Sequence, residues 1–329
     1  MERLAGWEGR RVLVTGATGV VGLNLVNTLV TAGSEVTALV RDWVPRARHL
    51  GAWLESGTVG IVRGELEDYC LLERTLAEYE IEYVFHLGAQ TIVPVGNRSP
   101  VSTFRANIEG TWNLLEACRV LGMYDTTLRA ICVASSDKAY GSSPVLPYTE
   151  DMPLAGEHPY DVSKSCTDLI AQSYGRTYDL PVGIARMGNI YGPGDLNFNR
   201  IVPGTIRSII EGRAPAIRSD GTPVREYFYV GDAVLAYLTL AEKTERQSLR
   251  GEAFNFSSGE KRSVSEVVGE IIRLMGADMV PEILNTGRHE IQDQYLAIEK
   301  ARRVLGWEPA VGLSDGMQRT IAWYREVLS

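Results

Sequence analysis

A run of glycines between an apolar segment and an amphipathic one most constrains the fold of this chain. Arg11–Thr15 reads RVLVT, which is typical of a buried strand, and TGATGVVG follows it directly. Residues 20–32 then carry apolar side chains at positions 21, 25, 29 and 32, the spacing of one helix face. A strand, a glycine turn and a helix in this order indicate a dinucleotide-binding unit, in which a diphosphate approaches bare backbone at the helix N-terminus.

The glycines of this turn are Gly16, Gly19 and Gly22, in the spacing GxxGxxG. Glycine serves three purposes here: a tight turn, close approach of a diphosphate, and close packing of the helix on the strand. The helix N-terminus adds a positive dipole end that favours the phosphates.

The end of the second predicted strand bears on the choice of dinucleotide. An acidic residue at position 40 would accept hydrogen bonds from the adenosine ribose and favour NAD, but Val40 stands there. Arg41 suits the 2′-phosphate of NADP, whereas Asp42 suits the ribose hydroxyls of NAD. These residues therefore fit either cofactor.

Strands and helices alternate along the first half of the chain. The expected strands are Arg11–Thr15, Glu35–Val40, Val59–Arg63, Tyr83–Leu87 and Ala130–Ala134, and the longest helical patterns are Val101–Leu121 and Tyr160–Tyr178. Strands that are apolar throughout predict an α/β fold, a Rossmann-type doubly wound parallel sheet covered on both faces.

Beyond Gly192 the sequence holds more proline, glycine and charge, which indicates a smaller C-terminal mixed α/β domain for the substrate. We expect residues 1–188 with 226–255 to form the NAD(P)-binding domain. Residues 189–225 with 256–329 would form the nucleotide-sugar-binding domain.

Composition limits the partners and the compartment. Lys and Arg number 33 and Asp and Glu 41, so the net charge is 33 − 41 = −8, which argues against nucleic acid or an anionic membrane as partner. No apolar run approaches the roughly 18–20 residues of a membrane span, and the first residues lack the pattern of a secretory signal. The four cysteines and four histidines are scattered. We therefore expect a cytoplasmic protein with core thiols and no metal site.

Tyr160 and Lys164, in the segment YDVSK, lie one helical turn apart and face the same way. An ammonium beside a phenol favours the phenolate and lowers the pKa of the tyrosine. The pair is therefore typical of a general base that takes the proton of a hydroxyl while its carbon is oxidised.

Four segments together, TGATGVVG, NIEGT, SSDKAYG and YDVSK, resemble the extended short-chain dehydrogenase/reductase family over nearly the whole chain. The resemblance implies that Ser136 hydrogen-bonds the reacting sugar oxygen and that Asn107 supports Lys164 through water. The segment FHLGAQ would lie along the cofactor, with His86 either in a direct role there or as a core histidine. The cofactor-binding residues that this implies are Gly16, Thr18, Gly19, Val20, Val21, Gly22, Arg41, Asp42, Glu65, Leu66, Leu87, Gly88, Ala89, Asn107, Tyr160 and Lys164.

Asp137 and Lys138, which follow Ser136, separate two reactions of that family. Members that remove water carry an acid and then a base at these positions, whereas members that only epimerise carry small or apolar residues. Removal of water from a 4-keto sugar requires a base for the C5 proton and an acid for the C6 hydroxyl. The alternative interpretation is an exposed ion pair, since adjacent strand residues point to opposite faces.

A closer resemblance is to CDP-glucose 4,6-dehydratases, and it rests on the segments SSDK, GWEGRRVLVTG, RMGNIYGPGD and VLGWEPAVGL. Those enzymes use NAD, so the resemblance favours NAD as the cofactor of this chain. SSPVLPYTED is instead more similar to epimerases. Arginine suits a diphosphate because its planar fork donates two hydrogen bonds. The substrate-binding residues that the resemblance implies are Gln90, Ser136, Asn189, Arg200, Arg225 and Arg288.

The sequence therefore predicts a nucleotide-sugar 4,6-dehydratase that forms a 4-keto-6-deoxy sugar by transient C4 oxidation. The alternatives are a 4-epimerase of UDP-glucose or UDP-glucuronate, a GDP-mannose 4,6-dehydratase, or a non-catalytic dinucleotide sensor. The long helical patterns Val101–Leu121 and Tyr160–Tyr178 resemble the pair through which this family forms homodimers by a four-helix bundle.

Overall fold

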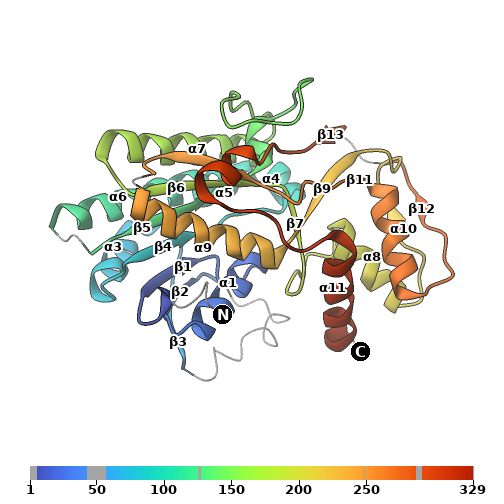
Figure 1. Cartoon of the computed structure of the whole chain (residues 1–329), viewed down its shortest axis with the longest axis horizontal. Helices are drawn as coiled ribbons and strands as arrows, with labels where there is room; N and C mark the ends of the chain where they lie inside the picture. The colour runs from blue at the N-terminus through green and yellow to red at the C-terminus, as the bar shows by residue number, and fades with distance from the viewer. Residues whose placement is uncertain (1–5, 43–56, 125–126, 248, 287–290, 329) are drawn as a thin grey trace.

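The computed structural model describes residues 6–42, 57–124, 127–247, 249–286 and 291–328. A sheet of seven parallel strands, in the order β10-β6-β5-β4-β1-β2-β3, forms its larger part (Figure 1). The strands are β1 (Arg11–Thr15), β2 (Glu35–Val40), β3 (Val59–Arg63), β4 (Tyr83–His86), β5 (Ala130–Ala134), β6 (Val182–Met187) and β10 (Glu252–Phe256). All five predicted strands are present, and only the fourth ends one residue earlier than expected.

Helices cover both faces of this sheet, which confirms the doubly wound fold (Figure 1). They are α1 (Val20–Thr31) and α9 (Val230–Gln247) on one face, and α3 (Tyr69–Glu78), α6 (Gly110–Tyr124) and α7 (Pro159–Tyr178) on the other. Successive strand residues serve opposite faces, so Leu13 belongs to the core under α6 and Val14 to the core under α9.

The predicted helix Val101–Leu121 is interrupted. It consists of α5 (Pro100–Phe104), a π-helical turn η3 (Arg105–Glu109) and α6. Two threonine hydroxyls meet the carbonyl of Asn107 within this turn, from Thr111 at 2.5 Å and from Thr167 at 2.8 Å. Single π-turns of this kind occur frequently at functional sites.

The smaller part of the molecule is built on a second sheet, in the order β11-β9-β13 with β7 also paired to β9. Its strands are β7 (Asn189–Tyr191), β9 (Val224–Tyr229), β11 (Lys261–Ser263) and β13 (Asp293–Gln294), its helices are α8 (Ile201–Ile210), α10 (Val264–Met275) and α11 (Leu313–Leu328), and β8 (Ala216–Ile217) pairs with β12 (Glu282–Ile283). The three helices stand beside the large sheet (Figure 1). The predicted change of domain at residue 226 divides β9, whereas all of β9 belongs to the small sheet and α9 begins at Val230.

All four cysteines are free thiols. Cys118 and Cys132 are buried and Cys166 is partly buried, but Cys70 is exposed on α3, so the prediction of core thiols is wrong for Cys70. Among the described residues, no helix combines the length and apolar character that crossing a bilayer requires.

Candidate active site

The candidate site lies at the carboxyl ends of the large sheet's strands. The strand order reverses between β1 and β4, and ligands of doubly wound sheets bind at such a point. The glycine turn follows β1, residues 87–90 follow β4, and residues 135–138 follow β5. The predicted cofactor and catalytic segments therefore meet at one edge of the sheet.

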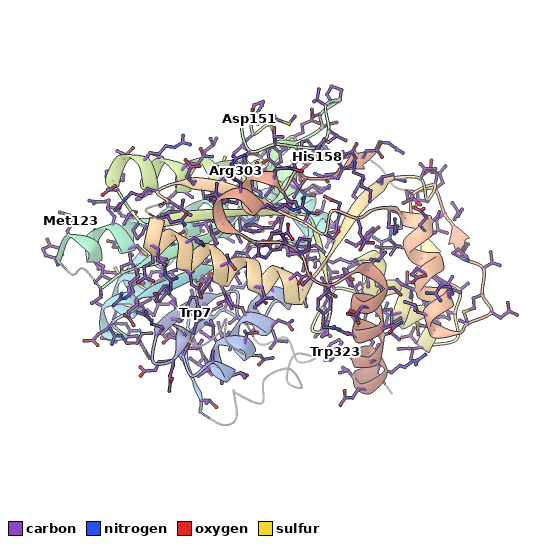
Figure 2. The ribbon with its side chains drawn as sticks, in the orientation of Figure 1. Trp7, Met123, Asp151, His158, Arg303 and Trp323 are labelled. Carbon is purple, nitrogen blue, oxygen red and sulfur yellow. The ribbon has the colours of Figure 1, made fainter. Side chains whose placement is uncertain are left out.

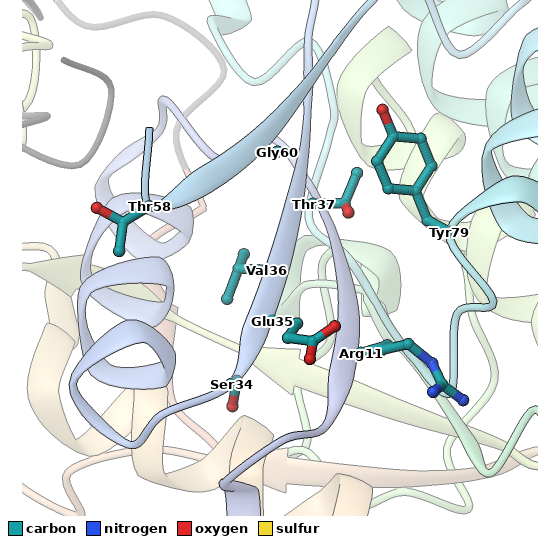
Figure 3. Close-up of a pocket in the computed structure, with 8 residues that line it drawn as sticks. All are labelled: Arg11, Ser34, Glu35, Val36, Thr37, Thr58, Gly60 and Tyr79. Atoms are coloured by element: carbon teal, nitrogen blue, oxygen red, sulfur yellow. The ribbon is translucent and has the colours of Figure 1, made fainter. Parts of the chain in front are cut away.

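A depression lies at the other end of the strands, where residues at the amino ends of β1, β2 and β3 line it (Figure 3). Arg11 and Glu35 are the first residues of β1 and β2, and Thr58 precedes β3. None of its lining residues is a predicted site residue, and ligands of doubly wound sheets bind at the carboxyl ends of the strands, so this depression is not the candidate active site.

The glycine turn is a bare backbone cradle. Gly16 has a φ of +69°, and a Cβ there would lie 2.7 Å from the backbone N of Gly88. A Cβ on Gly22 would lie 2.1 Å from the carbonyl oxygen of Gly16. Helix α1 begins after Gly19 without a side-chain cap, so its first N–H groups are available to an anion. The cradle thus fits the diphosphate of a dinucleotide.

The loop after β4 is fixed to β1 through His86. Its Nδ1 is 2.9 Å from Thr15 Oγ1, its Nε2 is 3.0 Å from Thr111 Oγ1, and Thr15 Oγ1 also accepts the N–H of Gly88 at 2.9 Å. Burial, and then the charge of Lys164, lower the pKa of His86 to about 3. His86 is therefore a neutral core residue.

Residues expected near the adenosine end lie after β2 and β3. Arg41 and Asp42 pair with each other at 2.7 Å, and both side chains are more than half exposed. Glu65 is exposed, whereas Leu66 is buried beside Gly88. This geometry provides one cation and one carboxylate at the end of β2 and favours neither NAD nor NADP.

Ser136, Asp137 and Lys138 stand where the chain leaves β5. The strand ends at Ala134, and Asp137–Tyr140 forms a 3-10 helix, η4, that Ser136 caps. Ser136 Oγ donates to Asp137 Oδ1 at 3.0 Å and accepts the N–H of Lys138 at 3.2 Å. The strict alternation of a strand therefore does not apply here. Asp137 is buried, unlike a carboxylate of an exposed ion pair.

The surroundings of Asp137 suit an acid. Burial raises the pKa of its carboxyl, while Lys138, the hydroxyl of Ser136 and Arg225 offset part of this rise. Gly188 lies beside this carboxyl group: a Cβ there would be 3.4 Å from Asp137 Oδ2, an ordinary contact distance. Such a group holds its proton to a higher pH than an exposed aspartate.

Tyr160 and Lys164 lie at the start of α7, one turn apart. Lys164 is buried, its Nζ donates to the carbonyl of Ala134 at 2.7 Å, and burial lowers its pKa to about 8 although Asp168 raises it. Desolvation raises the pKa of Tyr160 to about 12.

The predicted lowering of the pKa of Tyr160 is thus wrong: the pKa is raised, and Lys164 is not among the groups that shift it most. Arg200 and the hydroxyl of Ser136 favour the phenolate, but desolvation and the nearby Asp137 and Asp161 outweigh them. The physical reason is burial, which penalises the phenolate and the ammonium alike.

Asn107 joins the loop after β4 to the catalytic helix. Its Oδ1 accepts the N–H of Gln90 at 2.7 Å, and its Nδ2 donates to the carbonyl of Gln90 at 3.0 Å and to Ser163 Oγ at 2.9 Å. Its side chain therefore holds the two segments together, and η3 presents it there.

The predicted substrate residues occupy different positions. Arg200 precedes the first residue of α8, and its side chain pairs with Asp195 at 3.1 Å, whereas Asn189 is exposed at the start of β7. Arg225 donates to the carbonyls of Val224 and Gln292, both at 2.8 Å, and to that of Ile291. These bonds fasten β13 to β9. Arg288 lies outside the described residues.

Sequence reasoning missed a buried ion pair and a glutamine. Arg186 on β6 makes two hydrogen bonds to Asp168, at 2.8 and 2.9 Å. Asp168 stands four residues after Lys164, a spacing that could have indicated a shared helix face. Gln294, which accepts a hydrogen bond from Lys138, gave no local signal because 156 positions separate the two.

The fold and the residues around Tyr160 define a class of protein, the extended short-chain dehydrogenase/reductases. A family model described as GDP-mannose 4,6 dehydratase matches residues 13–320, so the chain belongs to this family of nucleotide-sugar dehydratases and epimerases. This confirms the predicted resemblance.

Known relatives include both kinds of enzyme. The chain is 30% identical to CDP-glucose 4,6-dehydratase of Salmonella typhimurium, over 97% of this chain and 91% of the relative. It is also 30% identical to UDP-glucose 4-epimerase of Mycolicibacterium smegmatis, over 96% of this chain and 98% of the relative. A solved dTDP-glucose 4,6-dehydratase from Streptomyces venezuelae with NAD bound matches with a TM-score of 0.85 at 28% identity, covering 96% of this chain and 97% of that one.

Proposed function

We propose that this chain is an NAD-dependent nucleotide-sugar 4,6-dehydratase. The observation that carries the proposal is the buried Asp137, which lies between Ser136 and Lys138 at the end of β5 with a raised pKa. A 4-epimerase has no step that requires an acid and a base at this place. A dehydratase requires both.

The bare backbone at Gly16, Gly19 and Gly22 would hold the diphosphate of NAD against the start of α1. Bound NAD supplies the oxidising equivalent at C4 of the sugar and the reducing equivalent at C6. NAD in the solved relative supports this choice over NADP.

The chain's own residues carry the proton transfers. Tyr160, in its phenolate form, accepts the proton of the C4 hydroxyl. Ser136 and Arg200 favour this form, against the burial that raises the pKa of the tyrosine. Lys138 then accepts the C5 proton, and the electrons of that C–H bond remain on the sugar as the enolate of the C4 ketone. Asp137 gives its proton to the C6 oxygen, the C6–O bond breaks, and water leaves.

The reaction can be tested by incubating the protein with CDP-, dTDP-, UDP- and GDP-hexoses and measuring product mass. We expect one of them, CDP-glucose by the similarity of the Salmonella relative, to lose one water. An unchanged mass with a new isomer would instead identify a 4-epimerase. The epimerase relatives, at the same 30% identity, make this the second candidate.

Two variants test the assigned roles. Tyr160→Phe is expected to abolish both oxidation and elimination, because it removes the group that accepts the C4 proton. Lys138→Met is expected to lower the elimination step by about 10²- to 10⁴-fold while C4 oxidation persists. Undiminished water loss in Lys138→Met would refute the dehydratase mechanism.

We also propose that the chain forms a homodimer through α6 and α7. Large apolar side chains are exposed on α5, α6 and α7, among them Val101, Trp112 and Leu169, and Met123 stands at the free end of α6 (Figure 2). Exposed apolar surface of this kind is typical of protein interfaces. Light scattering is expected to give a dimeric mass for the wild type and a monomeric mass for Trp112→Glu. Val280→Glu, a similar change on the small domain, is expected to remain dimeric.

A further inference from the structure

The short strand β13 brings a side chain of the small domain to the catalytic segment. β13 runs parallel to β9, with Asp293 opposite Val224 and Gln294 opposite Arg225. Gln294 is 1% exposed, and its Oε1 accepts a hydrogen bond from Lys138 Nζ at 2.5 Å. The lysine to which we assign the C5 proton is therefore held by an amide from a distant part of the chain.

The amide nitrogen of Gln294 is a buried donor. Nε2 of Gln294 is buried and has no hydrogen-bond partner among the described residues. A buried donor without a partner destabilises a fold, and an apolar side chain of similar size would avoid this loss. Local stability therefore does not explain a glutamine at this position, whereas the bond from its Oε1 to Lys138 does.

We propose that Gln294 is a positioning residue that holds Nζ of Lys138 with a neutral acceptor and so directs the amine toward the C5 proton. This inference rests on the dehydratase function proposed above. An amide oxygen accepts an N–H from an ammonium and from a neutral amine, so it fixes the position of Nζ while favouring the ammonium less than a carboxylate would. A carboxylate in the same place would favour the ammonium, which cannot accept a proton.

Lys138 lies among other charged and titratable groups. Two acidic residues, Asp137 on η4 and Asp161 on α7, interact electrostatically with Lys138. Arg225, which is opposite Gln294 in the pairing of β9 with β13, carries a positive charge that interacts with Asp137. The other titratable and charged groups that interact with this cluster are Tyr148, His158, Tyr160, Arg200, Glu226 and Lys261. A carboxylate at position 294 would place a negative charge in direct contact with the amine.

The test is the pH dependence of water loss in Gln294→Glu and Gln294→Met. The substrate is the nucleotide hexose that loses water in the panel above, and incorporation of deuterium at C5 from D₂O reports the action of the base. For Gln294→Glu, we expect the pH below which the elimination rate falls (its acidic limb) to rise by about one unit, with the rate of C4 oxidation unchanged. For Gln294→Met, we expect elimination and C5 exchange to fall at least about tenfold, because Nζ is no longer held.

Two controls separate this role from a structural one. Gln318→Glu makes the same charge change on the exposed face of α11 and is expected to leave the limb where it is. Gln294→Met removes the unpartnered amide, so its thermal stability is expected to match or exceed that of the wild type. An unmoved limb in Gln294→Glu, or wild-type elimination in Gln294→Met, would overturn the role of Gln294.

Failure of the proposed function would look different. If the wild type removes water from no hexose, or if Lys138→Met removes it at the wild-type rate, the dehydratase function fails together with this inference. If the wild type removes water and Lys138→Met does not, only the Gln294 variants decide the present inference.

Discussion

Asp168→Asn tests the buried ion pair that joins the catalytic helix to the sheet. Asp168 on α7 is 0% exposed and Arg186 on β6 is 2% exposed, and two hydrogen bonds of 2.8 and 2.9 Å connect them. Replacing the carboxylate with an amide leaves a buried guanidinium that still donates to the hydroxyl of Tyr140 and the carbonyl of Glu150 and lies over the Tyr140 ring. We expect a loss of about 3–5 kcal/mol in the free energy of unfolding, because a buried charge is left without its counter-charge.

A second ion pair provides a matched control. Asp315 and Arg319 on α11 have similar geometry, with hydrogen bonds of 3.2 and 2.7 Å, but both side chains are more than half exposed. Solvent screens such a pair, so Asp315→Asn is expected to lose less than about 0.5 kcal/mol. Urea unfolding followed by circular dichroism measures both values on the same protein.

Two results would refute this reasoning. One is an equal loss in both variants, which would mean that burial does not set the strength of these pairs. The other result concerns Lys164. Burial lowers the pKa of Lys164 to about 8, and the charge of Asp168 offsets part of this fall. Asp168→Asn is expected to lower that pKa further, and an unchanged lysine titration by NMR would contradict the coupling.

Three further predictions follow from the same site. Gly16→Ala is expected to lower NAD affinity more than about tenfold and to destabilise the fold more than Gly9→Ala, as measured by NAD titration and urea unfolding. Both glycines have a positive φ, but only at Gly16 would a Cβ meet backbone, at Gly88. In the unfolded chain His86 takes up a proton below about pH 6.5, whereas in the folded chain it does so only near pH 3. The free energy of unfolding is therefore expected to fall between these values as pH decreases, by up to about 1.4 kcal/mol per pH unit from this residue. His86→Asn is expected to lack this contribution. Because the raised pKa of Asp137 keeps its acid form to higher pH, water loss is expected to decrease as pH rises through that pKa, and Asp137→Asn to lose both this limb and about 10²- to 10⁴-fold in rate.

Local patterns were sufficient for the cofactor half of the protein. The strand β1, the glycines after it and the first helix follow from residues within a window of about twenty positions. Tyr160 and Lys164 are likewise one helical turn apart, so a single helix places them together. These features could be predicted because the backbone of one element, or of two joined by a short turn, fixes their geometry.

Long-range packing decided the rest of the site. Lys138 contacts Gln294 only because β13 pairs with β9. Arg225 on β9 donates to the carbonyl of Gln292, just before β13. No pattern near Lys138 contains this information.

The sequence by itself determined the doubly wound fold, the glycine cradle and the identity of the residues that follow β5. Only the tertiary structure decided their ionisation. Proximity to Lys164 alone predicted a lowered pKa for Tyr160, whereas burial raises it. Spacing along the chain fixes which groups are neighbours, but burial and the charges brought by distant segments fix which protonation state each group prefers.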